Sequence, residues 1–394
     1  YPPVMVSDAQ AGSADPEVQA SLENAASLLS VGRVDEAQAS INKALQLDPN
    51  AGLAYALRAV INVVQNNNDQ ALADGDQAVA LSSDSSAAKI ALSYAQQANY
   101  QIRAARDTLL QAVDVQPGEP LAWARLSELQ LMLGDRKQSR IAASRSLAID
   151  PNLERAWITR GFAALAEFDN VTAKSAFKRA ITLESADPIA HLGLGLAKIS
   201  DGEVEAGGRD IEVAVALDSN SALLRAYLGK TYFAEKRYPL DSEQFSIAKQ
   251  LDPNDPTAYL YDGILKQTVN RPVEAARDFG RSIELNDDRA VYRSRLLLDK
   301  DRASRGTSQA RAYRDLGFSQ LGLNASTNSL VMDPSNASAH RYLSDVYQGV
   351  RRREVARVSE LFQAQMLQDV NSNPIQPSVS STNLNIVTAG GPAS

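Results

Sequence analysis

The sequence contains no cysteine and only two histidines, His191 and His340, in 394 residues. Without cysteine the chain cannot form disulfides, thiolate nucleophiles or cysteine metal sites. The two histidines stand far apart, so we expect each to lie on a helix face rather than act as a metal ligand or a catalytic base. No pair of carboxylates has a recognisable acid–base arrangement. We therefore expect no catalytic residues, no metal and no cofactor, and we predict that the chain is not an enzyme.

Aromatic residues and long apolar runs are also scarce. Aromatic residues make up 6% of the chain and hydrophobic residues 44%, a composition that suits an alanine-rich helical array packed through small side chains. There is no run of about 18 apolar residues, so we expect no helix that spans a membrane. The net charge is −7, from 40 basic and 47 acidic residues. This balance disfavours a general attraction to nucleic acid.

The stretch from Asn152 to Glu184 predicts a pair of helices. Its apolar residues recur with a helical period on both sides of a short turn. The small residues Gly161 and Ala173 would let the two helices lie close together, with Trp157 and Phe177 filling the space beside that contact. A pair of this kind cannot bury its apolar faces alone, so it needs neighbours of the same shape.

The same pattern returns along the chain at intervals of 34 residues. The position after the turn is held by Ala37, Ala71, Ala105, Ser139, Ala173, Gly207, Asp241 and Ala275. The position seven residues later is held by Ala44, Ala78, Ala112, Ser146, Ala180, Ala214, Ala248 and Ser282. Prolines that close the second helix stand at Pro49, Pro117, Pro151 and Pro253. Eight units fit this one register from Val18 to Arg289 without a gap.

A repeated helix pair with these anchors resembles the tetratricopeptide repeat (TPR). The resemblance implies an all-α, right-handed superhelical solenoid of about ten helix–turn–helix repeats, with a break in register near residues 290–302. We expect an N-terminal linker at 1–17, eight repeats at 18–289, an irregular insertion or partial repeat at 290–302, two further repeats at 303–370 and an extended C-terminal tail at 371–394.

The C-terminal part has a narrower resemblance. The segment YRSRLLLDKDRASR, from Tyr292 to Arg305, and the sequence that follows it to Ile386 resemble the end of the TPR array in large bacterial envelope proteins, where a barrel-like outer-membrane region follows. The resemblance implies a periplasmic or other extracytoplasmic location, with membrane association only through a region outside this sequence. A cytoplasmic location is the alternative. The sequence starts YPPVMVSDAQ without an initiator methionine, so we expect a processed protein or an excised piece of a longer one.

In TPR arrays the first helices of the repeats line a concave groove, which the resemblance places on this chain too. The predicted groove residues are Leu131, Met132, Ile158, Phe162, Leu165, Leu192, Leu196, Ile199, Lys230 and Phe233. This strip is mainly apolar, with Glu128 and Arg155 set in it, and it predicts a groove for an apolar helix or an extended peptide. The alternative interpretation is that packing within the superhelix covers some of these side chains. Where related families capture a C-terminal carboxylate with Lys and Asn, this chain has Ala124, Ile158 and Ala226, so we predict no such clamp.

A second predicted surface is basic. It comprises Arg293, Arg295, Arg302, Arg305, Arg351, Arg352 and Arg353. Acidic residues such as Asp299 and Asp301 lie among them, so one interpretation is a solvated face that is paired internally. The other is a docking site for an acidic partner, an anionic lipid headgroup or an anionic polysaccharide.

The sequence thus predicts a non-enzymatic scaffold that binds a protein or peptide partner in the concave groove. The alternative function is a periplasmic module of an outer-membrane export or receptor system, which guides an anionic polymer or a secreted partner. A third hypothesis is an enzyme subunit whose chemistry lies outside these residues. We predict no nucleic-acid partner. The amphipathic last helix, near residues 353–368, would be covered by the tail or by a second copy in a homodimer.

Overall fold

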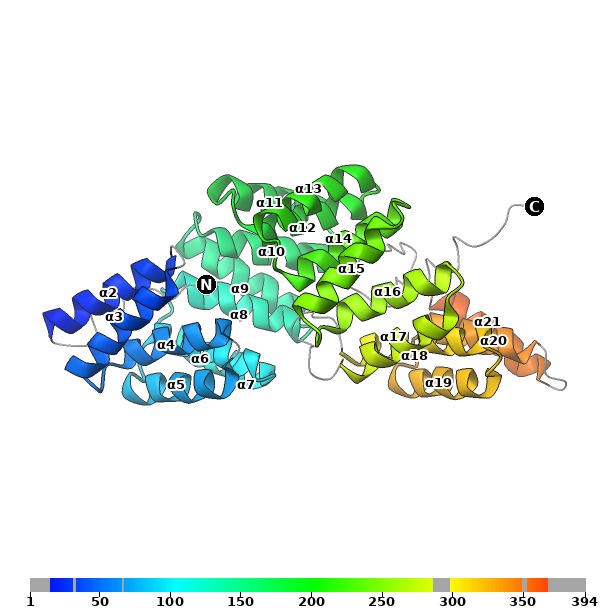
Figure 1. Cartoon of the computed structure of the whole chain (residues 1–394), viewed down its shortest axis with the longest axis horizontal. Helices are drawn as coiled ribbons and strands as arrows, with labels where there is room; N and C mark the ends of the chain where they lie inside the picture. Colours follow the sequence, from blue (N-terminus) through cyan, green and yellow to red (C-terminus); the bar gives the residue numbers. More distant parts are fainter. Residues whose placement is uncertain (1–14, 31–32, 66, 286–297, 349–352, 368–394) are drawn as a thin grey trace. The chain divides into compact units, whose positions relative to one another are not determined.

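The computed structural model describes residues 15–30, 33–65, 67–285, 298–348 and 353–367. Within these ranges the chain forms twenty α-helices and no strand, and the helices follow one another as repeated pairs (Figure 1). The prediction of an all-α solenoid of about ten helix–turn–helix repeats is confirmed. The first fourteen residues, the start of the predicted insertion at 290–297 and the predicted tail at 371–394 lie outside the described residues.

The first eight repeats each contain a first and a second helix. The first helices are α2 (Pro16–Ser30), α4 (Gly52–Val64), α6 (Ser86–Ala98), α8 (Pro120–Met132), α10 (Glu154–Ala166), α12 (Pro188–Ser200), α14 (Ala222–Ala234) and α16 (Pro256–Thr268). The second helices are α3 (Val34–Leu47), α5 (Asn68–Leu81), α7 (Ile102–Val115), α9 (Arg136–Ile149), α11 (Asn170–Leu183), α13 (Val204–Leu217), α15 (Leu240–Leu251) and α17 (Pro272–Glu284). Two more pairs follow, α18 (Leu298–Asp315) with α19 (Ser319–Met332) and α20 (Ala337–Tyr347) with α21 (Glu354–Met366). Residues 298–302 of the predicted insertion are therefore helical and begin α18.

Helix ends follow local sequence signals. At the start of α12, the Asp187 carboxylate accepts a hydrogen bond of 2.7 Å from the backbone N–H of Ile189, and Pro188 takes the first helical position. Proline fits there because its missing N–H has no partner inside the helix. At the end of α9 the backbone becomes extended at Asp150, whose carboxylate accepts from the N–H of Asn152 at 2.9 Å. Segments of the form Leu-x-x-Asp-Pro-Asn, as at residues 45–50 and 147–152, therefore end the second helix of one repeat and precede the first helix of the next.

The turn between the two helices of a pair has a left-handed residue at one position of the repeat. Positive φ angles occur at Tyr100, Gly134, Phe168, Gly202, Lys236 and Asn270, and again at Gly317. Glycine adopts this backbone conformation without the steric penalty that other residues meet. Glycine stands at this position in Gly134, Gly202 and Gly317, whereas Tyr100, Phe168, Lys236 and Asn270 adopt the same conformation with a side chain.

A second periodic feature joins each first helix to the turn before it. One side chain per repeat donates a hydrogen bond to the backbone carbonyl six residues earlier, from Tyr55, Lys89, Trp123, Trp157, His191, Arg225 and Tyr259. His340 makes the same bond to Pro334 O at 2.9 Å. Both histidines thus support the repeat architecture, as expected for residues on a helix face.

Small residues and phenylalanines make the core where helices cross. A Cβ added at Gly193 would lie 2.2 Å from the Phe177 ring, and Phe177 is fully buried. That contact joins α12 to the second helix of the preceding repeat, whereas Gly229 against Phe245 and Gly263 against Phe279 join the two helices of one repeat. This close fit explains why the repeat keeps a small residue on the first helix and a large one on the second.

The helices form two compact units, one ending at Ala163 and one starting at Ala164. Several first helices of successive repeats touch one another, as α4 touches α6 and α14 touches α16. Among the described residues, no comparable contact joins successive second helices, which instead pack on the first helix of the next repeat. We call the side of each unit that these first helices form its inner face. None of the described helices is long and apolar enough to cross a membrane.

Candidate partner-binding surfaces

The predicted groove residues lie on first helices, but packing covers most of them. The buried side chains are Leu131, Ile158, Leu165, Leu192, Leu196, Ile199 and Lys230. Met132, Phe162 and Phe233 are half-buried. For these buried side chains the structure agrees with the alternative interpretation, in which packing between the helices covers them. The use of this strip as a peptide groove stays a prediction, and it now rests on the half-buried members and on polar neighbours.

Four polar side chains form a closed ring on the inner face of the first unit. The buried Arg125 guanidinium stacks 3.7 Å from the centroid of the Tyr94 ring and donates to Glu128 Oε2 at 2.7 Å. Glu128 Oε1 accepts from Arg155 Nη1 at 3.3 Å, and the same Nη1 lies 3.2 Å from the Tyr94 hydroxyl. The four residues come from α6, α8 and α10, so the ring joins three successive repeats.

Part of this ring, which we call the Tyr94–Arg155 ring, is open to solvent. The side chain of Arg155 is 33% exposed and that of Glu128 is 21% exposed, whereas Arg125 is only 4% exposed. Arg125 is held underneath by Ser93 Oγ at 3.2 Å and by the Gln97 side-chain carbonyl. The ring therefore offers a fixed guanidinium and a fixed carboxylate side by side, which can pair with complementary groups of a polypeptide.

Sequence reasoning named Glu128 and Arg155 but missed Tyr94 and Arg125. Tyr94 and Glu128 occupy the same position of successive repeats, and Phe162 and Lys230 occupy that position in the fifth and seventh repeats. That register was a usable signal for Tyr94. Arg125 gave no such signal, because its partners Ser93 and Gln97 belong to the preceding repeat.

The inner face of the second unit holds a buried lysine. Lys230 is 4% exposed, and its Nζ donates to the Tyr261 hydroxyl at 2.9 Å. Its amine also lies 4.3 Å from the centroid of the Tyr261 ring, and the Tyr227 ring lies 6.5 Å from that ring. No ion pair joins Lys230 to another residue within the described ranges. Burial lowers the pKa of Lys230 well below its usual value.

A compact ion-pair cluster lies between α15, α16 and α17. Lys249 contacts Asp262 and Asp278 at 2.5 and 3.1 Å, and Lys266 contacts them at 2.9 and 2.5 Å. Burial lowers the pKa of Lys266, but the hydrogen bonds to Asp278 and Asp262 outweigh it, so the pKa is raised. These groups pair with one another within the fold. They hold two repeats together rather than offering charge to a partner.

The predicted basic surface is wrong at Arg305. This residue is fully buried, and its Nη1 donates to Ser282 O and Ser282 Oγ, both at 2.8 Å. These hydrogen bonds join α18 to the end of α17 in the preceding repeat, and they give the buried guanidinium polar partners. Arg353 is exposed and stacks 5.0 Å from the Tyr347 ring centroid. Arg293, Arg295, Arg351 and Arg352 lie outside the described residues, as does the side chain of Arg302.

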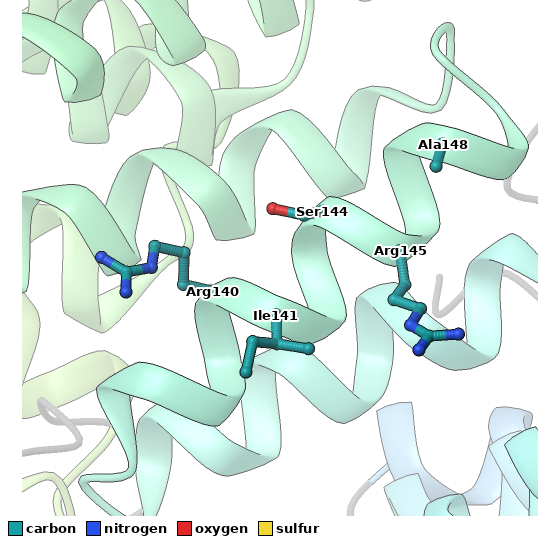
Figure 2. A pocket seen from close by; sticks show the side chains of 5 residues that line it. All are labelled: Arg140, Ile141, Ser144, Arg145 and Ala148. Atoms are coloured by element: carbon teal, nitrogen blue, oxygen red, sulfur yellow. The ribbon is translucent and has the colours of Figure 1, made fainter.

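A shallow cleft of about 540 Å³ lies on a second helix, α9 (Figure 2). It is lined by Arg140, Ile141, Ser144, Arg145 and Ala148. A second cleft, of about 520 Å³, lies in the second unit and is lined by Val204, Glu205, Arg209, Glu212, Ala234, Glu235 and Arg237. In the part of the chain that the structure describes, no group of three or more His, Cys, Asp or Glu side chains is arranged to hold a metal ion.

Comparisons with known proteins agree with this architecture. The tetratricopeptide repeat family matches the sequence at residues 22–86. No curated protein matches the chain. The fold is similar to that of the APC/C hetero-tetramer Cut9–Hcn1, with a TM-score of 0.66, 14% identity, and coverage of 95% of this chain and 76% of that one. It is also similar to a monomeric mutant of IFIT1 with Gppp-AAAA, with a TM-score of 0.56, 12% identity, and coverage of 90% and 82%. The family match and the shared fold together support a TPR-type repeat scaffold, a class that commonly binds proteins or peptides.

Proposed function

We propose that this chain is a non-enzymatic scaffold that binds an extended segment of a protein partner on the inner face of its first unit. The observation that carries the proposal is the Tyr94–Arg155 ring. It spans three successive first helices and exposes Arg155 and Glu128 beside each other. An extended peptide that crosses several first helices would contact the same repeat position once in each repeat.

The half-buried Met132 and Phe162 add apolar contact area on α8 and α10, the helices that carry Glu128 and Arg155. Small apolar contacts next to fixed charges are a common arrangement at peptide-binding surfaces, since the apolar groups supply affinity and the charges fix register. We therefore expect the bound segment to contain an acidic side chain opposite Arg155 and an apolar side chain close to it.

A random-peptide phage library tests this proposal with the full chain as bait. The same library is selected against the wild type, Arg155→Glu and Arg160→Glu. Arg160 is the matched control, because it is a partly exposed arginine on the same helix that stacks on Trp157 outside the ring. We expect one family of peptides that the wild type and Arg160→Glu retain and that Arg155→Glu loses. If Arg155→Glu retains every enriched family, the inner-face proposal is wrong.

The periplasmic alternative stays a prediction that rests on the resemblance of residues 292–386. Its test is fractionation of cells that make this protein, with protease added to intact and permeabilised cells. Protection until the outer membrane is opened would agree with that prediction. Recovery in the cytosol would leave a scaffold in the cytoplasm.

A further inference from the structure

Helix α9 has a charge unlike that of its neighbours in the first unit. Its fourteen residues include Arg136, Lys137, Arg140 and Arg145 and no acidic residue. The second helix two repeats before it, α5, carries three aspartates and no basic residue, and α7 carries two arginines and two aspartates. In a chain of net charge −7, this helix is therefore a local positive region.

The positive side of α9 faces outward. Its other side packs against α8 through small residues, with Ser139 close to Ser127 and the Ser146 hydroxyl bonded to Pro120 O at 2.7 Å. Lys137, Ile141 and Arg145 follow one another at four-residue intervals, which places them along one side of the helix. All three are exposed, and Ile141 is 41% exposed.

The cleft on α9 combines an apolar centre with charged edges. Figure 2 shows Ile141 between Arg140 and Arg145, whose guanidinium groups extend to opposite sides. The Arg145 guanidinium carbon lies 5.5 Å from the centroid of the Trp123 ring, which orients that side chain. Arg136 and Arg140 have further partners within the chain, so the argument rests on Lys137, Ile141 and Arg145.

We propose that the outer side of α9 is a second docking surface, separate from the inner face, for an acidic segment of a protein partner. The segment carries an aliphatic side chain that covers Ile141 and carboxylates on both sides of it, toward Lys137 and Arg145. An extended polyanion or an anionic membrane presents charge without an apolar group at this spacing.

Charge reversal on α9 tests the proposal. The phage selection described above is repeated with Lys137→Glu/Arg145→Glu and with the control Arg277→Glu/Arg281→Glu. The control changes the net charge by the same amount through two exposed basic residues on α17, where Glu274, Asp278 and Glu284 lie among them. We expect a family of acidic peptides with an internal aliphatic residue that the wild type, the control and Arg155→Glu retain and that the α9 variant loses.

A fluorescein-labelled peptide of that family then gives affinities by anisotropy. We expect binding to weaken about tenfold or more in the α9 variant and to weaken with added salt. Replacing Ile141 by alanine should weaken it about threefold, because part of the apolar contact is lost. Circular dichroism of each variant shows whether the helices are intact.

The outcomes separate this proposal from the inner-face proposal. Loss of the acidic family in the α9 variant, with retention in Arg155→Glu and in the Arg277→Glu/Arg281→Glu control, supports a second surface, and it does so whether or not Arg155→Glu loses a different family. Absence of any family that depends on α9 overturns it. So does binding of only heparin or phosphatidylserine vesicles through Lys137 and Arg145, since the surface would then serve a polyanion or a membrane.

Discussion

Glu128 in the first unit and Lys230 in the second occupy the same position of the repeat, yet their surroundings differ. Glu128 is 21% exposed and pairs with two arginines, whereas Lys230 is 4% exposed and contacts the hydroxyl and ring of Tyr261. The repeat period thus decides on which face a residue lies. The side chains of the adjacent repeats decide whether a charge at that position is open to a partner or enclosed.

Removing Arg125 should have the largest effect on stability. Arg125→Ala takes away the cation above Tyr94 and leaves Glu128 without its closer arginine. Breaking a largely buried charge pair from one side destabilises a protein by about 3 kcal/mol. Urea unfolding followed by circular dichroism measures this. Arg160→Ala is the control. An equal loss of unfolding free energy in the two variants would show that the Tyr94–Arg155 ring does not stabilise the fold.

Lys230 should give an effect of opposite sign. Lys230→Met replaces a buried amine by an apolar side chain of similar length, and we expect about 2 kcal/mol of added stability near pH 7. Lys249→Met is the contrast, because Lys249 is paired with Asp262 and Asp278 and its loss should be destabilising. A destabilised Lys230→Met would mean that the amine is held by interactions stronger than its burial.

The pH dependence of that difference has a definite sign. The pKa of Lys230 is lowered in the folded state, so the unfolded chain binds more protons between the lowered value and 10.5. Stability contributed by this group therefore rises with pH across that window. The advantage of Lys230→Met should shrink as the pH approaches 10.5. Thermal melts of the two proteins at several pH values check this, and a constant difference would contradict it.

The turns give a smaller and cleaner comparison. Lys236 and Gly202 hold the same left-handed turn position, with φ of 59° and 87°. Lys236→Gly should stabilise the chain by about 1 kcal/mol, and Gly202→Ala should destabilise it by a similar amount. A Cβ at Gly202 meets nothing within 4 Å, so only backbone strain would change there. Lys236→Ala is the control and should leave the melting temperature nearly unchanged.

The sequence period was sufficient to predict the paired helices and to place the predicted groove residues on first helices. Burial could not be predicted in the same way, since it depends on side chains one repeat away. The sequence period predicts Leu192 and Leu196 as groove residues, but both side chains are buried in the core. Arg305 read as a surface arginine, yet it bonds to Ser282 in the preceding repeat.

Turn chemistry was also only partly visible in the sequence. Glycine marks the turn at Gly134 and Gly202, but Tyr100, Phe168 and Lys236 adopt the same backbone without a local sequence signal. The Tyr94–Arg155 ring is hidden in the same way, because each member is ordinary by itself and only the alignment of three repeats brings them together.

The affinity of a selected inner-face peptide for the wild type, Arg155→Glu and Arg160→Glu, measured by isothermal titration calorimetry, tests the proposed function most directly. We predict a loss of about tenfold or more for Arg155→Glu and little change for Arg160→Glu, because only Arg155 belongs to the exposed ring. Equal affinities for the two variants would contradict the proposal and would move the binding surface away from the first unit's inner face.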